Sequence, residues 1–167
     1  MNTAHMITEF RVGSRKADVV LLNGSSTVYE IKTEYDSYSR LIDQVNEYMK
    51  MFDFINVFTS KEQLSTVEKL VPDNVGLLYL SKSSISVYRE AYSNKANIDL
   101  SVVFDSLRKN EYLNAVGTFY GDIPVVPNTR LFSVCKEKFC QIPVEAANEL
   151  FVQELKKRKN ARLLREF

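Results

Sequence analysis

Residues 17–32 read ADVVLLNGSSTVYEIK, two apolar runs on either side of Asn23-Gly24-Ser25. Runs rich in Val, Leu, Tyr and Ile that are joined by a short loop with a glycine are typical of a β-hairpin. We therefore predict strands over residues 17–23 and 26–33. A strand that only built a core would have little use for the acid and the base of Glu30-Ile31-Lys32, so the hairpin is also the first candidate for a functional site.

The length of the turn determines which residues lie opposite one another. A two-residue Asn-Gly loop would place Asp18 opposite Tyr29, whereas a three-residue loop over residues 23–25 places Asp18 opposite Glu30. Three-residue hairpin loops with a glycine in the left-handed conformation are common, and we predict this register or an equivalent bulge. Two acids directly opposite each other destabilise a sheet, and a cation between them would relieve the repulsion.

The two faces of the second strand follow from its alternation, because residues two apart share a face. Glu30 and Lys32 point one way, and Tyr29 and Ile31 point the other way, into a core. Two carboxylates and the Ile31 carbonyl suit a hard cation such as Mg²⁺. The lysine could steer a bound water or stabilise charge on a phosphate. The alternative is that Glu30 and Lys32 form the solvated face of an amphipathic strand.

The composition limits the chemistry. The chain has 167 residues, 45% of them hydrophobic and 26% charged, as in an ordinary globular protein of one domain. No apolar run approaches the roughly 20 residues that span a membrane, and the N-terminal sequence lacks the order of a signal peptide, so we expect a cytoplasmic protein. Two cysteines and one histidine cannot build a conventional zinc site, and the lone His5 argues against a Ser-His-Asp or Cys-His triad.

Helical and strand-like patterns alternate up to about residue 92, and helical periodicity dominates from residue 98. We predict a short helix over residues 2–11, then, after the hairpin, a helix beginning at Asp36 or Ser37, strands over 54–60, 75–81 and 84–91, and a helix over 61–71. The fold class is α/β: a mixed central sheet covered by helices on both faces (residues 1–92), followed by a mainly helical C-terminal segment (residues 98–167) packed on it.

The helix after the hairpin presents an inward stripe of Leu41, Val45, Tyr48 and Phe52. Gln44 belongs to this stripe, four residues before Tyr48. A buried glutamine needs hydrogen-bond partners, which a carboxylate and lysine site on the hairpin would supply. A position at the boundary of the stripe is the alternative.

These motifs, in this order, resemble the PD-(D/E)XK nuclease superfamily. They are Asp18 before an apolar run, Glu30-Ile31-Lys32 on the next strand and Gln44-Val45-Asn46-Glu47-Tyr48 on the next helix. The Gln-x-x-x-Tyr element is similar to that of the RecB-like and lambda-exonuclease-like branches. Glu9, on the predicted N-terminal helix, matches the additional acid of many members, while Ala17 stands where the family often has proline. The resemblance covers residues 7–81 and is strongest to a bacterial branch of small predicted nucleases.

The resemblance implies a restriction-endonuclease-like core and metal-dependent hydrolysis of phosphodiester bonds, with DNA as the expected substrate. Asp18 and Glu30, with Glu9 as an accessory acid, would hold Mg²⁺ or Mn²⁺. Lys32 would activate water or stabilise charge, and Gln44 and Tyr48 would orient the site or the scissile phosphate. The alternative is a catalytically inactive module of the same fold that binds nucleic acid or a protein partner, and a homo-oligomer stays open.

A nuclease must also hold a polyanion, and the net charge of only +1 means that the basic residues must be local. The first candidates for phosphate contacts lie next to the predicted site and are Arg11, Arg15, Lys16 and Arg40. The second group is the C-terminal basic stretch of Lys156, Lys157, Arg158, Lys159, Arg162 and Arg165. For this stretch the alternative is a solvated helix end, where cations are favoured by the helix dipole.

Overall fold

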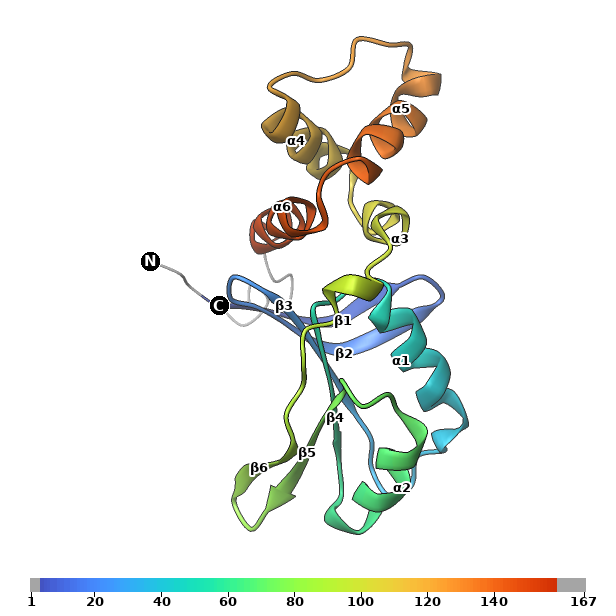
Figure 1. Ribbon diagram of the computed structural model, residues 1–167, viewed down its shortest axis with the longest axis vertical. Coiled ribbons are helices and arrows are strands. Elements are labelled where there is room, and N and C mark those ends of the chain that lie inside the picture. Colours follow the sequence, from blue (N-terminus) through green and yellow to red (C-terminus); the bar gives the residue numbers. More distant parts are fainter. Residues whose placement is uncertain (1–3, 159–167) are drawn as a thin grey trace, which may run out of the picture.

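The computed structural model describes residues 4–158 as an α/β structure around one six-stranded sheet (Figure 1). The strands lie in the sheet in chain order: β1 (His5–Val12), β2 (Arg15–Leu22), β3 (Ser26–Ile31), β4 (Phe54–Thr59), β5 (Gly76–Ser81) and β6 (Ser84–Arg89). Strands β3, β4 and β5 are mutually parallel, and the other neighbours are antiparallel. The sheet is therefore mixed, as the sequence predicts.

Helices connect the parallel strands and form the C-terminal part. They are α1 (Leu41–Met49), α2 (Leu64–Leu70), α3 (Leu100–Asp105), α4 (Lys109–Tyr120), α5 (Asn128–Cys140) and α6 (Val144–Lys156), with short 3₁₀ turns η1 (Tyr38–Arg40), η2 (Lys61–Gln63) and η3 (Lys95–Asn97). The β3–α1–β4 and β4–α2–β5 crossovers advance in the same direction along the sheet. Since such crossovers are right-handed, α1 and α2 lie on the same face (Figure 1).

The predicted register of the β2–β3 hairpin is confirmed. Leu22 pairs with Ser26 and Val20 pairs with Val28, so the loop between the strands has three residues. Gly24 takes φ +100°, the left-handed conformation that only glycine adopts at little cost, and the loop is closed by the Asn23 amide donating to the Ser25 carbonyl at 3.2 Å. The turn chemistry thus places Asp18 at the level of Glu30.

The helix predicted over residues 2–11 is wrong for the residues that the structure describes. Residues 5–12 form β1, which pairs antiparallel with β2. The strand was hidden in the sequence because Glu9 takes φ +56° and interrupts the alternation of buried and exposed side chains. Its neighbour Phe10 is buried and meets Phe52 edge-on, with the ring centroids 6.0 Å apart.

Helix α1 presents its predicted stripe to the sheet. Leu41, Val45, Tyr48 and Phe52 are all fully buried, and the rings of Tyr48 and Phe52 also pack edge to face. At roughly 1.5–3 kcal/mol for each fully buried large apolar side chain, this stripe is a major part of what holds α1 against β2, β3 and β4. The position of α1 fixes the side chains that it aims at β3.

The connector between β6 and α3 is anchored by Asn94, which is 1% exposed. Its side-chain amide donates to the carbonyls of Met49 (2.6 Å) and Phe52 (3.0 Å) at the end of α1. Upstream, Ala91 lies against Gly76 on the face of the sheet away from α1. A Cβ at Gly76 would stand 2.1 Å from the Asn56 side chain and 2.9 Å from the Ala91 amide, so only glycine fits there.

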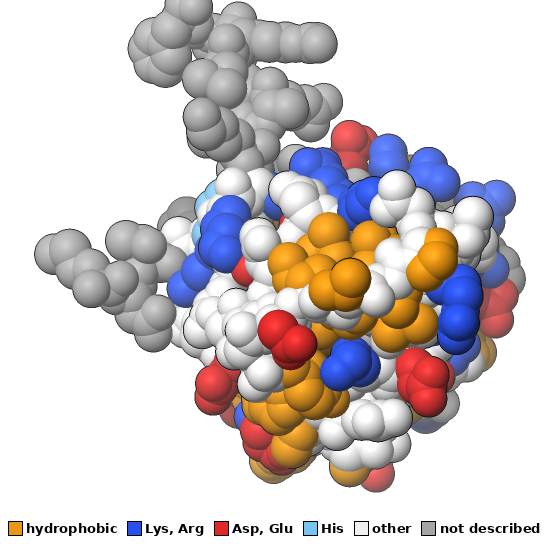
Figure 2. All heavy atoms as spheres, turned by 90° about the horizontal axis from the view of Figure 1, so that it is seen from above, with side chains coloured by type: hydrophobic (Ala, Val, Ile, Leu, Met, Phe, Trp, Pro, Cys, Tyr) orange, Lys and Arg blue, Asp and Glu red, His pale blue; other side chains and the backbone are white. Residues whose placement is uncertain are grey.

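The C-terminal helices pack on the sheet through α6. The hydroxyl of Ser26 at the start of β3 donates to the Asn148 side chain of α6 at 3.4 Å, and Arg158 stacks over the Phe10 ring. Seen from the far end of these helices, apolar side chains gather at the surface and are bordered by charged side chains of both signs (Figure 2). The large exposed apolar residues of this region are Phe119, Ile123, Val125 and Phe132.

The two cysteines are both free thiols: Cys135 is buried and Cys140 is exposed. Within residues 4–158 no helix is long and apolar enough to cross a membrane.

Glu111 is buried and ties α4 to the end of α6, because Arg158 donates to both carboxylate oxygens (2.7 and 2.6 Å). It also accepts from the Arg108 amide (2.7 Å) and so caps α4. Burial alone would raise the pKa of Glu111, but the hydrogen bonds from Arg158 and from the Arg108 amide outweigh it and hold that pKa below its usual value.

Glu111→Gln should lower the free energy of unfolding by about 3 kcal/mol at neutral pH, because Arg158 loses its counter-charge. Since the pKa is depressed in the folded chain, the stabilisation is complete above about pH 4.3 and is lost as the pH falls further. Urea denaturation at a series of pH values should show the two proteins converging below about pH 4. A difference that stays constant down to about pH 3 would contradict this assignment.

Candidate active site

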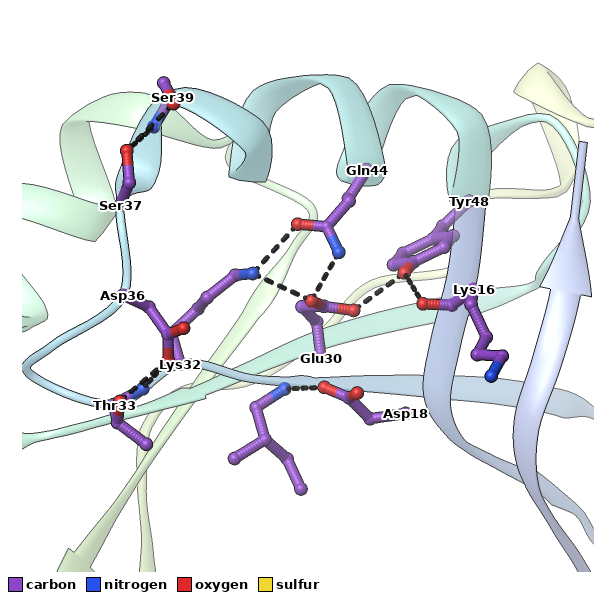
Figure 3. Close-up of polar contacts among 11 residues, drawn as sticks. Lys16, Asp18, Glu30, Lys32, Thr33, Asp36, Ser37, Ser39, Gln44 and Tyr48 are labelled. Carbon is purple, nitrogen blue, oxygen red and sulfur yellow. Dashed lines mark hydrogen bonds and ion pairs between the residues drawn. The ribbon is translucent and has the colours of Figure 1, made fainter. Parts of the chain in front are cut away.

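Glu30 is the centre of the candidate site. It is only 2% exposed, and burying a carboxylate is costly unless it is paired and hydrogen-bonded. Gln44 Nε2 donates to its Oε1 at 2.6 Å, and Lys32 Nζ pairs with the same oxygen at 2.9 Å. The Tyr48 hydroxyl donates to Oε2 at 2.7 Å (Figure 3). Strand β3 and helix α1 thus meet at one buried carboxylate.

Gln44 closes this cluster. Lys32 Nζ donates to Gln44 Oε1 at 2.9 Å, so the glutamine accepts from the lysine with its oxygen and donates to Glu30 with its nitrogen. The opposite orientation of the amide would place its NH₂ group against an ammonium group, so the network selects one rotamer. The sequence prediction that Gln44 faces a carboxylate and a lysine agrees with this geometry.

Tyr48 is held in its neutral form. Burial raises the pKa of its hydroxyl well above the usual range, and the charges of Glu30 and Asp18 add to the shift. The hydroxyl also lies 3.2 Å from the Lys16 carbonyl, but it has one proton and the Glu30 contact is the shorter. Tyr48 is therefore a hydrogen-bond donor at this site, with no role as a base.

Asp18 lies beside the cluster, where the ladder between β2 and β3 ends. Val19 and Tyr29 are the last recorded pair, and beyond them Asp18 Oδ2 accepts from the Ile31 amide at 2.8 Å. In Figure 3 Glu30 points from β3 toward α1, while the Asp18 carboxylate lies alongside the β3 backbone. Asp18 therefore joins the site through the backbone of Ile31 and has no hydrogen bond in common with Glu30.

Glu9 on β1 lies in the same row of the sheet as Asp18 on β2 and Glu30 on β3. The pairs Thr8–Val19 and Phe10–Ala17 bracket Glu9 and Asp18, so the predicted acids of β1, β2 and β3 are level. The Glu9 side chain, however, is 58% exposed and pairs with Lys16 at 3.5 Å. It reaches this row from a strand, which corrects the predicted helix. No cluster of three or more His, Cys, Asp or Glu side chains spaced to hold a metal occurs within residues 4–158.

The prediction that Ile31 points into a core is wrong. Ile31 is 46% exposed, whereas Glu30 and Lys32 lie under α1 and are buried. Residues 30 and 32 do share one face of β3, as predicted, but this is the buried face and Ile31 is on the exposed one. An apolar residue such as Ile31 is more often buried than a charged one, so Ile31 was expected on the core side, and the alternative of a solvated Glu30 and Lys32 is also wrong.

A turn over residues 33–36 follows Lys32 directly. The sequence predicted only that a helix begins at Asp36 or Ser37. Asp36 Oδ2 accepts from both the amide (2.7 Å) and the hydroxyl (2.8 Å) of Thr33, and these bonds hold the pKa of Asp36 below its usual value. Ser37 supplies the cap of η1 by accepting from the Ser39 amide. The Thr-x-x-Asp spacing was the available signal for this turn, which fixes the end of β3 beside the site.

The four basic candidates differ in their surroundings. Arg15 pairs with Asp43 at 3.1 Å and Lys16 pairs with Glu9. Arg11 and Arg40 are exposed, and no ion pair is recorded for either within residues 4–158. Of the C-terminal basic stretch, Arg158 is engaged by Glu111 and is not free for a ligand. Lys159, Arg162 and Arg165 lie outside the described residues.

The carboxylate oxygens of Glu30 and Asp18 are ligands that suit a hard divalent cation. Mg²⁺ takes oxygen ligands, usually one or two carboxylates and several waters. Glu30 Oε2 accepts one recorded bond, and Asp18 Oδ1 accepts none from residues 4–158, so each keeps lone pairs for a cation. Asp18 and Glu30 thus bring two carboxyl groups to a site that has one amine, that of Lys32.

Comparison with known proteins identifies the family. The model of the family described as bacteriophage P4 protein cII matches residues 1–166. The chain belongs to the bacteriophage P4 protein cII family. Protein cII of Enterobacteria phage P4 is 32% identical to it over 89 residues, which are 52% of this chain and 34% of that protein. The matched stretch is thus about a third of the length of the phage protein.

Among solved structures, a protein of unknown function from Silicibacter pomeroyi is similar to part of the chain. The two share 20% identity and a TM-score of 0.44 over 54% of this chain and 61% of that one. A similarity this low supports no argument about the function of this chain.

Lys32→Met should destabilise the protein by about 3–5 kcal/mol, because Glu30 would stay buried without its counter-charge. Glu30→Gln combined with Lys32→Met should recover much of this loss, since no charge is then buried. Lys50→Met, which removes the half-exposed partner of Glu47, is the matched control and should cost less than about 1 kcal/mol. Equal costs for the Lys32 and Lys50 variants in urea denaturation would show that the buried pair is not a strong interaction.

Proposed function

We propose that this chain is a metal-dependent nuclease that acts in the cytoplasm and hydrolyses phosphodiester bonds, with DNA as its substrate. The observation that supports the proposal is the buried cluster of Glu30, Lys32, Gln44 and Tyr48 with Asp18 beside it. These are the residues through which the sequence resembles the PD-(D/E)XK nucleases. A sheet and a helix that only packed together would gain more from apolar side chains at these positions.

Asp18 and Glu30 would hold Mg²⁺ or Mn²⁺, with Glu9 as an accessory acid on the neighbouring strand. When bound, the cation would lower the pKa of a coordinated water and neutralise charge on the phosphate. Asp18 can turn an oxygen toward a cation while the other still accepts from the Ile31 amide. Glu30 can do so through the free lone pair of Oε2.

Lys32 is placed to act on the reacting phosphate. An ammonium group has three N–H donors, and two of them serve Glu30 Oε1 and Gln44 Oε1. The third remains for a phosphate oxygen or for the attacking water. Because Glu30 and Gln44 fix the ammonium from two sides, little reorganisation would be needed during the reaction. Gln44 and Tyr48 act by positioning the Glu30 carboxylate.

Arg11 and Arg40 are the basic residues best placed to contact the nucleic-acid backbone, because each is exposed and has no recorded ion pair within the described residues. Arg15 and Lys16 would have to exchange Asp43 and Glu9 for phosphates. Such exchanges make binding sensitive to salt, since each phosphate contact releases counterions.

A second candidate function is a catalytically inactive module of this fold that binds nucleic acid or a protein partner. It is favoured by the engagement of both carboxylates, with three donors on Glu30 and the Ile31 amide on Asp18. In such a module the cluster would serve to join β3 to α1.

Cleavage of linear, circular and single-stranded DNA in the presence of Mg²⁺ or Mn²⁺ tests the first proposal. Asp18→Asn keeps an acceptor for the Ile31 amide but removes the charge, and it should reduce cleavage about 100-fold or more. Lys32→Ala should have a similar effect in a sample shown to be folded by circular dichroism. Asp73→Asn, at a fully exposed carboxylate, is the control and should cleave like the unaltered protein. Equal cleavage by all the variants would exclude the assignment.

Calorimetric titration with Mg²⁺ separates the two candidates. A nuclease site should bind the cation, and Asp18→Asn should abolish the heat of binding. If the unaltered protein neither binds Mg²⁺ nor cleaves any substrate, the inactive module becomes the better account of the site.

A further inference from the structure

Within residues 4–158, the face of the sheet away from α1 and α2 carries an exposed apolar patch, so the predicted cover of helices on both faces does not extend over this part of the sheet. Ile31, Phe58, Leu78 and Val87 form one row across four strands, and Leu80 and Ile85 pair in the next row. In these rows the exposed fraction is 46% for Ile31, 51% for Val87, 58% for Leu80 and 66% for Ile85. Contiguous exposed apolar side chains of this kind mark interaction surfaces in soluble proteins.

This patch reaches the outer edge of the sheet at β6. Strand β6 is the last in the sheet order and lies at the lower left of Figure 1, and no other strand of residues 4–158 pairs with its outer side. Residues 83–88 read SSISVY and contain neither a charge nor a proline. An edge strand of this composition is a ready template for pairing with another strand.

The opposite edge of the same sheet is protected. Strand β1 carries Glu9 and Arg11, and the positive φ of Glu9 distorts its backbone. Charges and backbone irregularities are the devices by which edge strands avoid pairing. Strand β6 has a register irregularity at Tyr88 and a charge at Arg89, but residues 84–87 carry neither device, so this segment of β6 is the one suited to a partner strand.

The backbone of β6 determines how a partner strand can pair. The tight turn between Ser81 and Ser84 makes these two residues the closing pair of the hairpin with β5. In an antiparallel ladder the residues alternate in the direction of their N–H and C=O groups. Ile85 and Val87 are therefore the residues whose backbone groups point out of the sheet.

We propose that β6 is a dimerisation edge, which pairs antiparallel with β6 of a second copy of this chain about a two-fold axis at Ser86. In this register Ile85 of one copy lies opposite Val87 of the other, and the reverse, so the outward backbone groups of both strands are satisfied. Two apolar cross-strand pairs then join the apolar patches of the two copies. A strand that pairs antiparallel with itself is self-complementary, as a two-fold interface requires.

The size of the contact sets the strength of the dimer. A strand of six residues gives a contact strip about 20 Å long and about 10 Å wide, on the order of 200 Å² in projection. A stable interface buries roughly 800 Å² on each partner. The dimer should therefore be weak, and its fraction should rise with protein concentration.

Sedimentation velocity tests the proposal with the whole chain at concentrations up to about 1 mM. A dimer should appear in the upper part of the range, and Val87→Lys should remove it by placing a charge in the strand pair. Val125→Lys is the matched control, because it makes the same change at a fully exposed valine between α4 and α5. A monomer at every concentration, or a dimer that loses as much to Val125→Lys as to Val87→Lys, would overturn the proposal.

Disulfide trapping tests the register. With Cys140→Ser and Cys135→Ala as the background, Ser86→Cys should form a covalent dimer under mild oxidation, because the two cysteines face each other across the axis. Ser84→Cys is the control and should not form a covalent dimer. It lies on the same side of the same strand, but it is far from position 84 of the second copy. Equal trapping at both positions, or none at position 86, would contradict pairing centred on Ser86.

Discussion

A single buried carboxylate organises this structure. Glu30 lies under α1 with almost no exposure, and the cost of removing its charge from water is met only if Lys32, Gln44 and Tyr48 stay in place. The apolar stripe of α1 supplies most of the burial, but the cluster fixes the rotation of the helix about its own axis. The local geometry of β3 and the seating of α1 are therefore set by the same interaction.

Strand β3 separates two surfaces of different character. Toward α1 it carries the acid and the base of the candidate site, and toward the other face Ile31 continues an apolar row that ends at Val87 on β6. Asp18 holds the amide of Ile31, the residue between Glu30 and Lys32. The two surfaces thus share one peptide segment, although each has its own chemistry.

Much of the hairpin could be predicted from sequence, because the Gly24 turn, the apolar runs and the alternation of β3 are local signals. The inward stripe of α1 and the contacts of Gln44 could also be predicted, because helical spacing is a local signal. Strand β1 was missed because the positive φ of Glu9, in the middle of its pairing with β2, interrupts the alternation of buried and exposed side chains. The buried side of β3 was misjudged because burial of Glu30 depends on partners that α1 supplies. The ion pairs that occupy Arg15 and Lys16 depend on tertiary contacts in the same way.

The central claim is that Asp18 and Glu30, with Lys32 beside them, form a site for a divalent cation. Crystals soaked in Mn²⁺ and measured for anomalous scattering test it most directly. The account predicts a peak within coordination distance of one oxygen of Asp18 and one of Glu30. A well-ordered site without such a peak at saturating Mn²⁺, with Glu30 still enclosed by its three side-chain partners, would contradict it.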